Sequence, residues 1–167
     1  MAAIETARIE GLTELQAALK ALPQKLHKRV LNSALMTGAR LIGKEASLKA
    51  PVLQEPTPGR RPGTLRRNIR ARPIRPEYSA SVMVGVRKLS GKQVMAFKKA
   101  NRRGGAANPD DPFYWRFVEF GTSKMAARPF LRPAFEARKV QAAMEIKDAL
   151  RLRIEREANK LRRWVRR

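Results

Sequence analysis

The chain has 167 residues, and 37 Lys and Arg against 14 Asp and Glu give it a formal net charge of +23. This length suits one domain, and a hydrophobic content of 43% is too high for a wholly disordered basic tail. The absence of cysteine excludes disulfide scaffolds and thiolate metal sites, and a single histidine excludes a histidine-based metal cluster. No apolar run approaches the roughly 18–20 residues that a membrane span needs. We therefore expect a polyanionic partner, and no cofactor, metal or membrane.

The N-terminal part, residues 11–50, has the pattern of two helices. Apolar residues recur every three or four positions in the first, at Leu12, Leu15, Leu19 and Leu22. Pro23 interrupts this pattern and suits the first turn of a second helix, which we expect to run to Ala50 because Pro51 follows.

Strands are expected in the middle of the chain. Residues 51–63 hold four prolines and two glycines and predict an extended loop, and residues 64–75 predict an irregular start and then an arginine-rich strand. Residues 78–86 predict a strand, because Tyr78, Ala80, Val82, Val84 and Val86 fall on one face. Residues 87–112 show no periodicity and predict a long basic loop.

Aromatic residues concentrate near the C-terminal end. Seven of the ten lie in residues 113–135, which we interpret as an aromatic strand at 113–120 followed by a turn. This strand could pair with residues 78–86 as a long hairpin. Residues 136–167 predict a long C-terminal helix, and Pro133 can sit in its first turn if the helix begins there.

The expected fold is therefore α+β. A small antiparallel sheet packs against two N-terminal helices and one long C-terminal helix, and the whole chain, residues 1–167, forms a single domain.

Candidate catalytic residues are sparse, and we expect no enzyme. His27 lies among basic residues on a predicted helix and is interpreted as a surface residue. Asp110 and Asp111, the adjacent acidic pair, sit in a turn-rich loop beside a basic run and suit a turn or a local charge partner. Glu119 lies between apolar residues and suits either a salt bridge to an arginine or backbone donors at the next turn.

Basic residues form two candidate binding segments, although no known nucleic-acid recognition motif is present. The first segment lines a DNA channel or pairs with acidic neighbours through Arg60, Arg61, Arg66, Arg67, Arg70, Arg72 and Arg75. The second is a docking loop, mobile in the free subunit and ordered on binding, with Lys98, Lys99, Arg102 and Arg103.

Three stretches together resemble one protein family. They read GLTELQAALKALPQK, KAPVLQEPTPGRRPGTLRRNI and YWRFVEFGTSKMAARPFLRPAFEA. The chain resembles the gene-ten-product family of tailed-phage neck and tail-completion proteins over roughly residues 10–155, and the third stretch is the most specific. The middle stretch departs from the family pattern, because a proline-rich insert separates Ala50-Pro51 from Gly63-Thr64-Leu65.

The resemblance implies a structural virion protein, made in the host cytoplasm, that forms a ring of six copies at the head–tail junction. This ring completes or terminates the tail and joins it to the DNA-filled head. Its partners are copies of itself, neighbouring neck proteins (connector or stopper, tail terminator, tail tube) and the phosphate backbone of packaged DNA.

For the ring we expect subunit packing and neighbour contacts from the most specific stretch. Buried aromatic anchors would dominate such an interface, although the same residues would also serve as monomer core. The set comprises Phe117, Glu119, Phe120, Gly121, Thr122, Arg128, Pro129, Phe130, Leu131, Pro133 and Phe135.

Two other classes stay open. One is a basic module of ribosomal or nucleoid type that binds nucleic acid independently of sequence, which the composition suits. The other is an enzyme acting on a polyanion, against which the lack of an acid–base pair argues.

Overall fold

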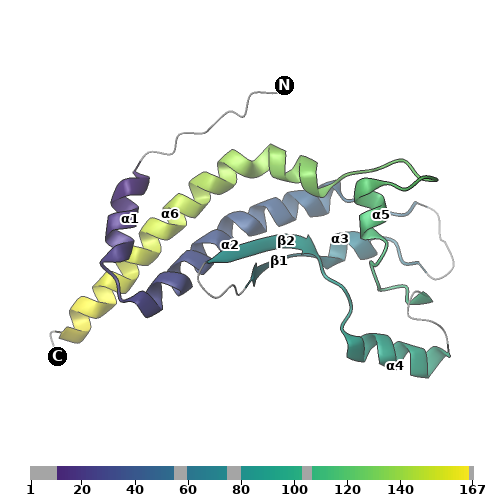
Figure 1. Ribbon diagram of the computed structural model, residues 1–167, viewed down its shortest axis with the longest axis horizontal. Coiled ribbons are helices and arrows are strands. Elements are labelled where there is room, and N and C mark those ends of the chain that lie inside the picture. The colour runs from purple at the N-terminus through teal and green to yellow at the C-terminus, as the bar shows by residue number, and fades with distance from the viewer. Residues whose placement is uncertain (1–10, 55–59, 75–79, 103–106, 166–167) are drawn as a thin grey trace. The chain divides into compact units, whose positions relative to one another are not determined.

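The computed structural model describes residues 11–54, 60–74, 80–102 and 107–165. Within them, six helices and a two-stranded antiparallel sheet form an α+β fold, as expected (Figure 1). In chain order the elements are α1 (Leu12–Lys20), α2 (Gln24–Lys49), α3 (Thr64–Asn68), β1 (Ile69–Ile74), β2 (Ser81–Val86), α4 (Gly91–Asn101), α5 (Trp115–Phe120) and α6 (Leu131–Val165).

The chain groups into two compact units. Unit 1 comprises residues 1–41, 71–83 and 138–167, and unit 2 comprises residues 42–70 and 84–137. The expectation of a single domain stays a prediction. No helix among the described residues is long and apolar enough to cross a membrane.

Unit 1 contains a core where α1 and the first part of α2 meet α6. Leu22, Val30 and Ile154 are buried there, with Leu15, Leu19 and Leu150 packed against them. Gly38 marks a close approach, because a Cβ at this position would lie 2.6 Å from the Ile146 Cδ1 atom and 2.8 Å from the Ala142 carbonyl oxygen. Arg153 of α6 donates to the hydroxyl oxygens of Ser33 (2.7 Å) and Thr37 (3.3 Å), so polar contacts join α2 and α6 as well.

Unit 2 contains the second core, built by the end of α2, α3, the sheet and the start of α6. Its buried residues are Ala46, Ala50, Leu65, Ile69, Phe130 and Ala134. Val84 and Val86 of β2 pack against this cluster, which confirms that the sheet rests on helices. Alanines on α2 and α6 leave room for one large aromatic ring, Phe130, at the centre.

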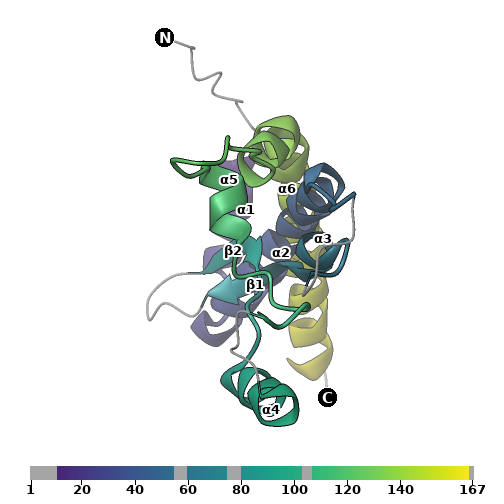
Figure 2. The same ribbon diagram turned by 90° about the vertical axis from the view of Figure 1, so that its right-hand side faces the viewer.

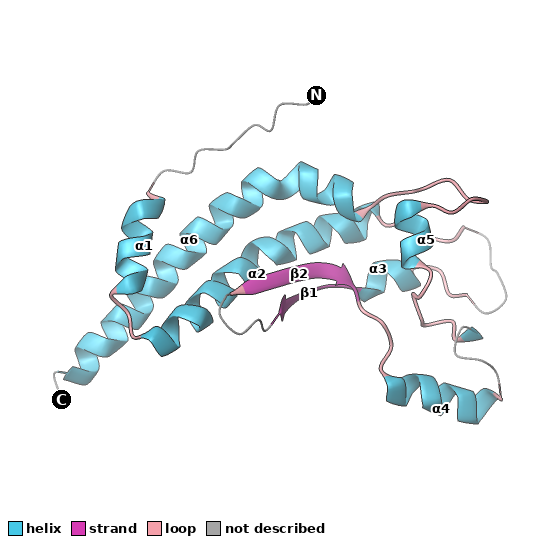
Figure 3. Ribbon diagram, in the orientation of Figure 1, coloured by secondary structure: helices cyan, strands magenta, loops and turns pink. Residues whose placement is uncertain are grey.

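Three predicted elements are wrong. The expected strand at 113–120 is helix α5 over Trp115–Phe120, coloured as helix in Figure 3, so it does not form a hairpin with β2. Aromatic composition favours strands, but a short segment adopts the conformation that its tertiary contacts select. The irregular start at residue 64 is a one-turn helix, α3, that leads directly into β1.

The third error is the basic loop, because residues 91–101 of the predicted 87–112 loop form helix α4. Ser90 begins it with a capping box: its hydroxyl accepts from the Gln93 N–H (3.3 Å), and the Gln93 side chain accepts from the Ser90 N–H (3.0 Å). Arg102 ends it in the left-handed conformation (φ 50°). The spacing Ser90-x-x-Gln93 is a capping-box signal in the sequence that the loop prediction missed.

Candidate interface between helices α5 and α6

Glu119 joins the end of α5 to the start of α6. Its buried carboxylate accepts three backbone N–H bonds, from Phe130 (2.8 Å), Leu131 (3.0 Å) and Arg132 (3.1 Å). The first N–H groups of a helix lack intrahelical acceptors and carry the positive end of its dipole, so a carboxylate there is stabilising. Of the two roles predicted for Glu119, the structure confirms backbone donors at the following turn.

The loop between the two helices is fixed at Gly121. Its φ of 74° and ψ of −177° lie in a region that only glycine adopts freely. A Cβ here would lie 2.9 Å from both the Ala127 N atom and the Met125 carbonyl oxygen. Two further backbone contacts hold the loop: the Thr122–Met125 bridge and a 2.8 Å bond from the Arg128 N–H to the Val118 carbonyl. Gly121 is therefore a tight backbone position.

Phe130 belongs to the packing of the subunit itself. None of its surface is exposed, and Trp115 and Val118 of α5 pack against the cluster that surrounds it. Leu131 and Pro133 at the start of α6 are half-buried. Together with Glu119 and Gly121, these residues anchor α5 and the start of α6 to the core of unit 2.

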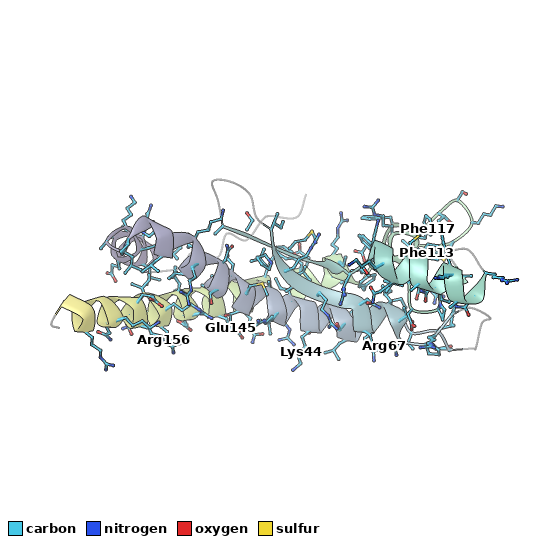
Figure 4. All side chains as sticks on the ribbon, turned by 90° about the horizontal axis from the view of Figure 1, so that it is seen from below. Lys44, Arg67, Phe113, Phe117, Glu145 and Arg156 are labelled. Carbon is cyan, nitrogen blue, oxygen red and sulfur yellow. The ribbon has the colours of Figure 1, made fainter. Side chains whose placement is uncertain are left out.

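The remaining aromatic residues of the predicted set face outward. Phe117 is 51% exposed, Phe120 is 72% exposed and Phe135 is 51% exposed. Phe117, labelled in Figure 4, and Phe120 are three residues apart and therefore share one face of α5, opposite the face that carries Trp115 and Val118. Thr122, Arg128 and Pro129 are exposed as well. Their role in an interface stays a prediction.

Several of the predicted channel arginines make contacts within unit 2. The Arg60 guanidinium lies over the rings of Phe113 (4.7 Å) and Tyr114 (5.0 Å), and Arg61 forms an ion pair with Asp110 (3.2 Å). Asp110 also closes a turn, since its N–H donates to the Asn108 side chain (3.0 Å). Both roles predicted for this acidic pair therefore occur at Asp110.

The next two arginines bond to backbone carbonyls. Arg66 donates to the Leu48 carbonyl (3.3 Å) in the last turn of α2, where cations suit the helix dipole. Arg67 donates to the Pro62 carbonyl (3.1 Å). Arg70 and Arg72 are exposed, and Arg75 lies outside the described residues. Binding of DNA or an acidic partner by this set stays a prediction.

The docking residues occupy a helix rather than a loop. Lys98 and Lys99 lie in the last turn of α4 and Arg102 is its C-cap, whereas Arg103 lies outside the described residues. Sequence reasoning missed Lys92 and Met95, which are exposed on the same helix.

Among the described residues, no group of three or more His, Asp or Glu side chains could hold a metal ion. His27 is half-buried rather than fully on the surface, and its Nε2 atom lies 2.6 Å from the Leu22 carbonyl oxygen. Burial raises the pKa of Tyr114 above its ordinary value, and the charges of Arg60 and Arg67 oppose this shift.

Comparison with known proteins identifies the family. Residues 13–121 match the family model described as "Bacteriophage HK97-gp10, putative tail-component", which covers about two thirds of the chain and ends at Gly121. No curated protein and no solved structure matches the chain. Members of this family are structural tail components. A tail component is part of the virion and contacts other tail or neck proteins. The chain therefore belongs to the HK97-gp10-like family of bacteriophage tail components.

Proposed function

We propose that this tail component forms a closed ring of six copies at the head–tail junction, where it completes or terminates the tail and joins it to the filled head. The observation that carries the proposal is the pair of exposed aromatic rings, Phe117 and Phe120, on a helix whose other face is fixed to the subunit core.

Exposed aromatic side chains on a rigid support are suited to subunit contacts. Aromatic residues supply much of the energy of protein interfaces when they are buried. The three bonds to Glu119 and the backbone contacts around Gly121 hold α5 before any neighbour arrives. Little additional ordering is then needed on association, which favours binding.

A closed ring uses two different surfaces of each subunit, one against the other surface of its neighbour. We assign the face with Phe117 and Phe120, flanked by Thr122, Arg128 and Pro129, to one side of this contact. Phe135, in the second turn of α6, extends the apolar character of the same unit.

The positive charge of the subunit calls for opposite charge on its neighbours in the particle. Each copy carries +23, and a ring of like-charged copies repels itself unless opposite charge is close. Acidic surfaces of the connector, stopper, terminator or tube proteins, or the phosphates of DNA in the channel, supply that charge. Contact with DNA through Arg70, Arg72 and Arg75 would be independent of sequence and would weaken steeply with salt.

The proposal is tested by complementing a phage that lacks this gene and counting copies per purified particle by quantitative mass spectrometry. We expect about six copies for the wild-type chain, the number that the family resemblance implies, and a strong loss of copies for Phe120→Ser. Met144→Ser is the matched control, because Met144 is a similarly exposed apolar residue on α6 in unit 1.

Two results would contradict the proposal. Phe120→Ser particles with a normal copy number would remove the role of the α5 face. A chain absent from particles that binds random duplex DNA or RNA tightly as a monomer would instead favour the nucleic-acid-binding alternative.

A further inference from the structure

Helix α4 stands out in unit 2 because it is formed without joining the core. It runs for 11 residues and none of its side chains is buried. Figure 2 shows it clear of α3 and α5, which lie in the same unit. Isolated helices of this length are marginal in water, so the capping box at Ser90 and the left-handed C-cap at Arg102 matter for its stability.

The charge on this segment is of one sign. Residues 87–102 contain six Lys and Arg and no Asp or Glu. Among the described residues, the ammonium groups of Lys92, Lys98 and Lys99 make no ion pair or hydrogen bond. The arginines of the earlier segment differ, because Arg61 is paired with Asp110 and Arg66 bonds to a helix carbonyl. Lys92, Lys98 and Lys99 on α4 are therefore available to a partner.

The outward face of α4 also carries an apolar residue. Lys92, Met95 and Lys99 are spaced three and four residues apart and share one face, whereas Val94 and Phe97 are half-buried. Met95 is 67% exposed between the two lysines. An apolar centre with a charged rim is the layout of a protein interface. A phosphate backbone would be gripped by the cations alone.

We propose that α4 docks on an acidic protein surface with an apolar centre, on a neighbouring virion protein other than this chain. A second copy of this chain is disfavoured as the partner of α4, because every copy carries +23 and its 14 Asp and Glu are outnumbered by 37 Lys and Arg. The inference rests on the proposed place of this chain among the neck proteins, and it names the surface that contacts the ring above or below.

The test places a photo-crosslinker in α4 of the full chain. Met95→p-benzoylphenylalanine is introduced by complementation, purified particles are irradiated, and adducts are identified by mass spectrometry. Met144→p-benzoylphenylalanine is the control, because it sits in unit 1 at comparable exposure. We expect a single adduct with one other virion protein, at an acidic peptide, that the control does not give.

The contribution of the lysine charges of α4 to docking is tested in the same particles. The triple change Lys92→Glu, Lys98→Glu and Lys99→Glu should lower the adduct yield at least tenfold, whereas the corresponding triple change to Arg should preserve it. In either case the chain must still be folded, which circular dichroism checks.

The outcomes separate this inference from the proposed function. An adduct with DNA, an adduct with a second copy, or no adduct in particles that contain the chain would overturn the docking role. An adduct yield unchanged by the three Lys→Glu substitutions would overturn the acidic partner. Absence of wild-type chain from the particles would overturn the junction role itself.

Discussion

The segment from α5 to the start of α6 and helix α4 both present side chains to solvent, but they are held by opposite means. The first is fixed to the core of unit 2 by a buried carboxylate, a glycine in a tight turn and a buried phenylalanine. The second buries no side chain and is stabilised by its own caps. Exposed residues on a rigid support suit a permanent subunit contact, whereas a charged helix outside the core suits docking to a separate partner.

The largest effect is expected at Phe130. Phe130→Ala should lower the free energy of unfolding by about 3–5 kcal/mol, because it removes a fully buried ring from the core of unit 2. Phe120→Ala is the matched control and should change it by less than about 0.5 kcal/mol, since Phe120 is exposed. Chemical denaturation measures both. Equal losses of stability in the two variants would contradict the burial of Phe130 in the core and the exposure of Phe120.

The next largest effect is expected at Glu119. Glu119→Ala leaves three backbone donors at the start of α6 without their acceptor and should cost about 2–3 kcal/mol of stability. Glu119→Gln keeps one oxygen acceptor and should cost less. Asp148→Asn, at an exposed position of α6, controls for loss of negative charge. If Glu119→Ala were no more harmful than Asp148→Asn in thermal unfolding, the capping role would be wrong.

Two glycine substitutions compare the regions directly. Gly121→Ala should cost about 1–3 kcal/mol, because alanine disfavours the backbone conformation and its Cβ would meet the loop backbone. Gly91→Ala, at the start of α4, has nothing within 4 Å of the added Cβ and should leave global stability unchanged. Denaturation midpoints that fall equally in both variants would contradict the contrast.

A smaller and local effect is expected at the cap of α4. Ser90→Ala removes the hydroxyl that accepts from Gln93 and should destabilise this helix by about 1 kcal/mol. Amide hydrogen exchange should then quicken severalfold in residues 91–101, with little change in unit 1. Uniform quickening across the chain would mean that α4 unfolds together with the core.

The smallest effect on stability is expected from the lysines of α4. Replacing Lys92, Lys98 and Lys99 by Gln should change the free energy of unfolding by less than about 0.5 kcal/mol, because these side chains are exposed and make no ion pair with described residues. A large loss would show that they serve the fold, and the docking role would lose its support.

The parts that sequence predicted correctly are those with long periodic patterns. The leucine stripe of α1, the interval between Pro23 and Pro51 for α2 and the alternation leading into β2 all matched the structure. The C-terminal helix was also correct, although it begins at Leu131 because Glu119 caps it there. That contact joins residues 11–13 positions apart, so no local pattern discloses it.

The parts that failed were short segments whose conformation depends on distant contacts. Helix α5 has the composition of a strand. However, Trp115 and Val118 are three residues apart, as are Phe117 and Phe120, and this spacing is typical of a helix. The number of positive charges can be read from the sequence, but the contacts of the arginines cannot. Arg60 lies over aromatic rings, Arg61 pairs with a carboxylate, and Arg66 and Arg67 bond to backbone carbonyls.

An electron cryomicroscopy reconstruction of the head–tail junction of purified particles, calculated without imposed symmetry, would show where this chain lies. We expect a closed ring of this chain between the connector and the tail tube, with Phe117 and Phe120 buried against the next copy. Copies located only along the tube or at its distal end, or a ring with both rings in solvent, would contradict this expectation.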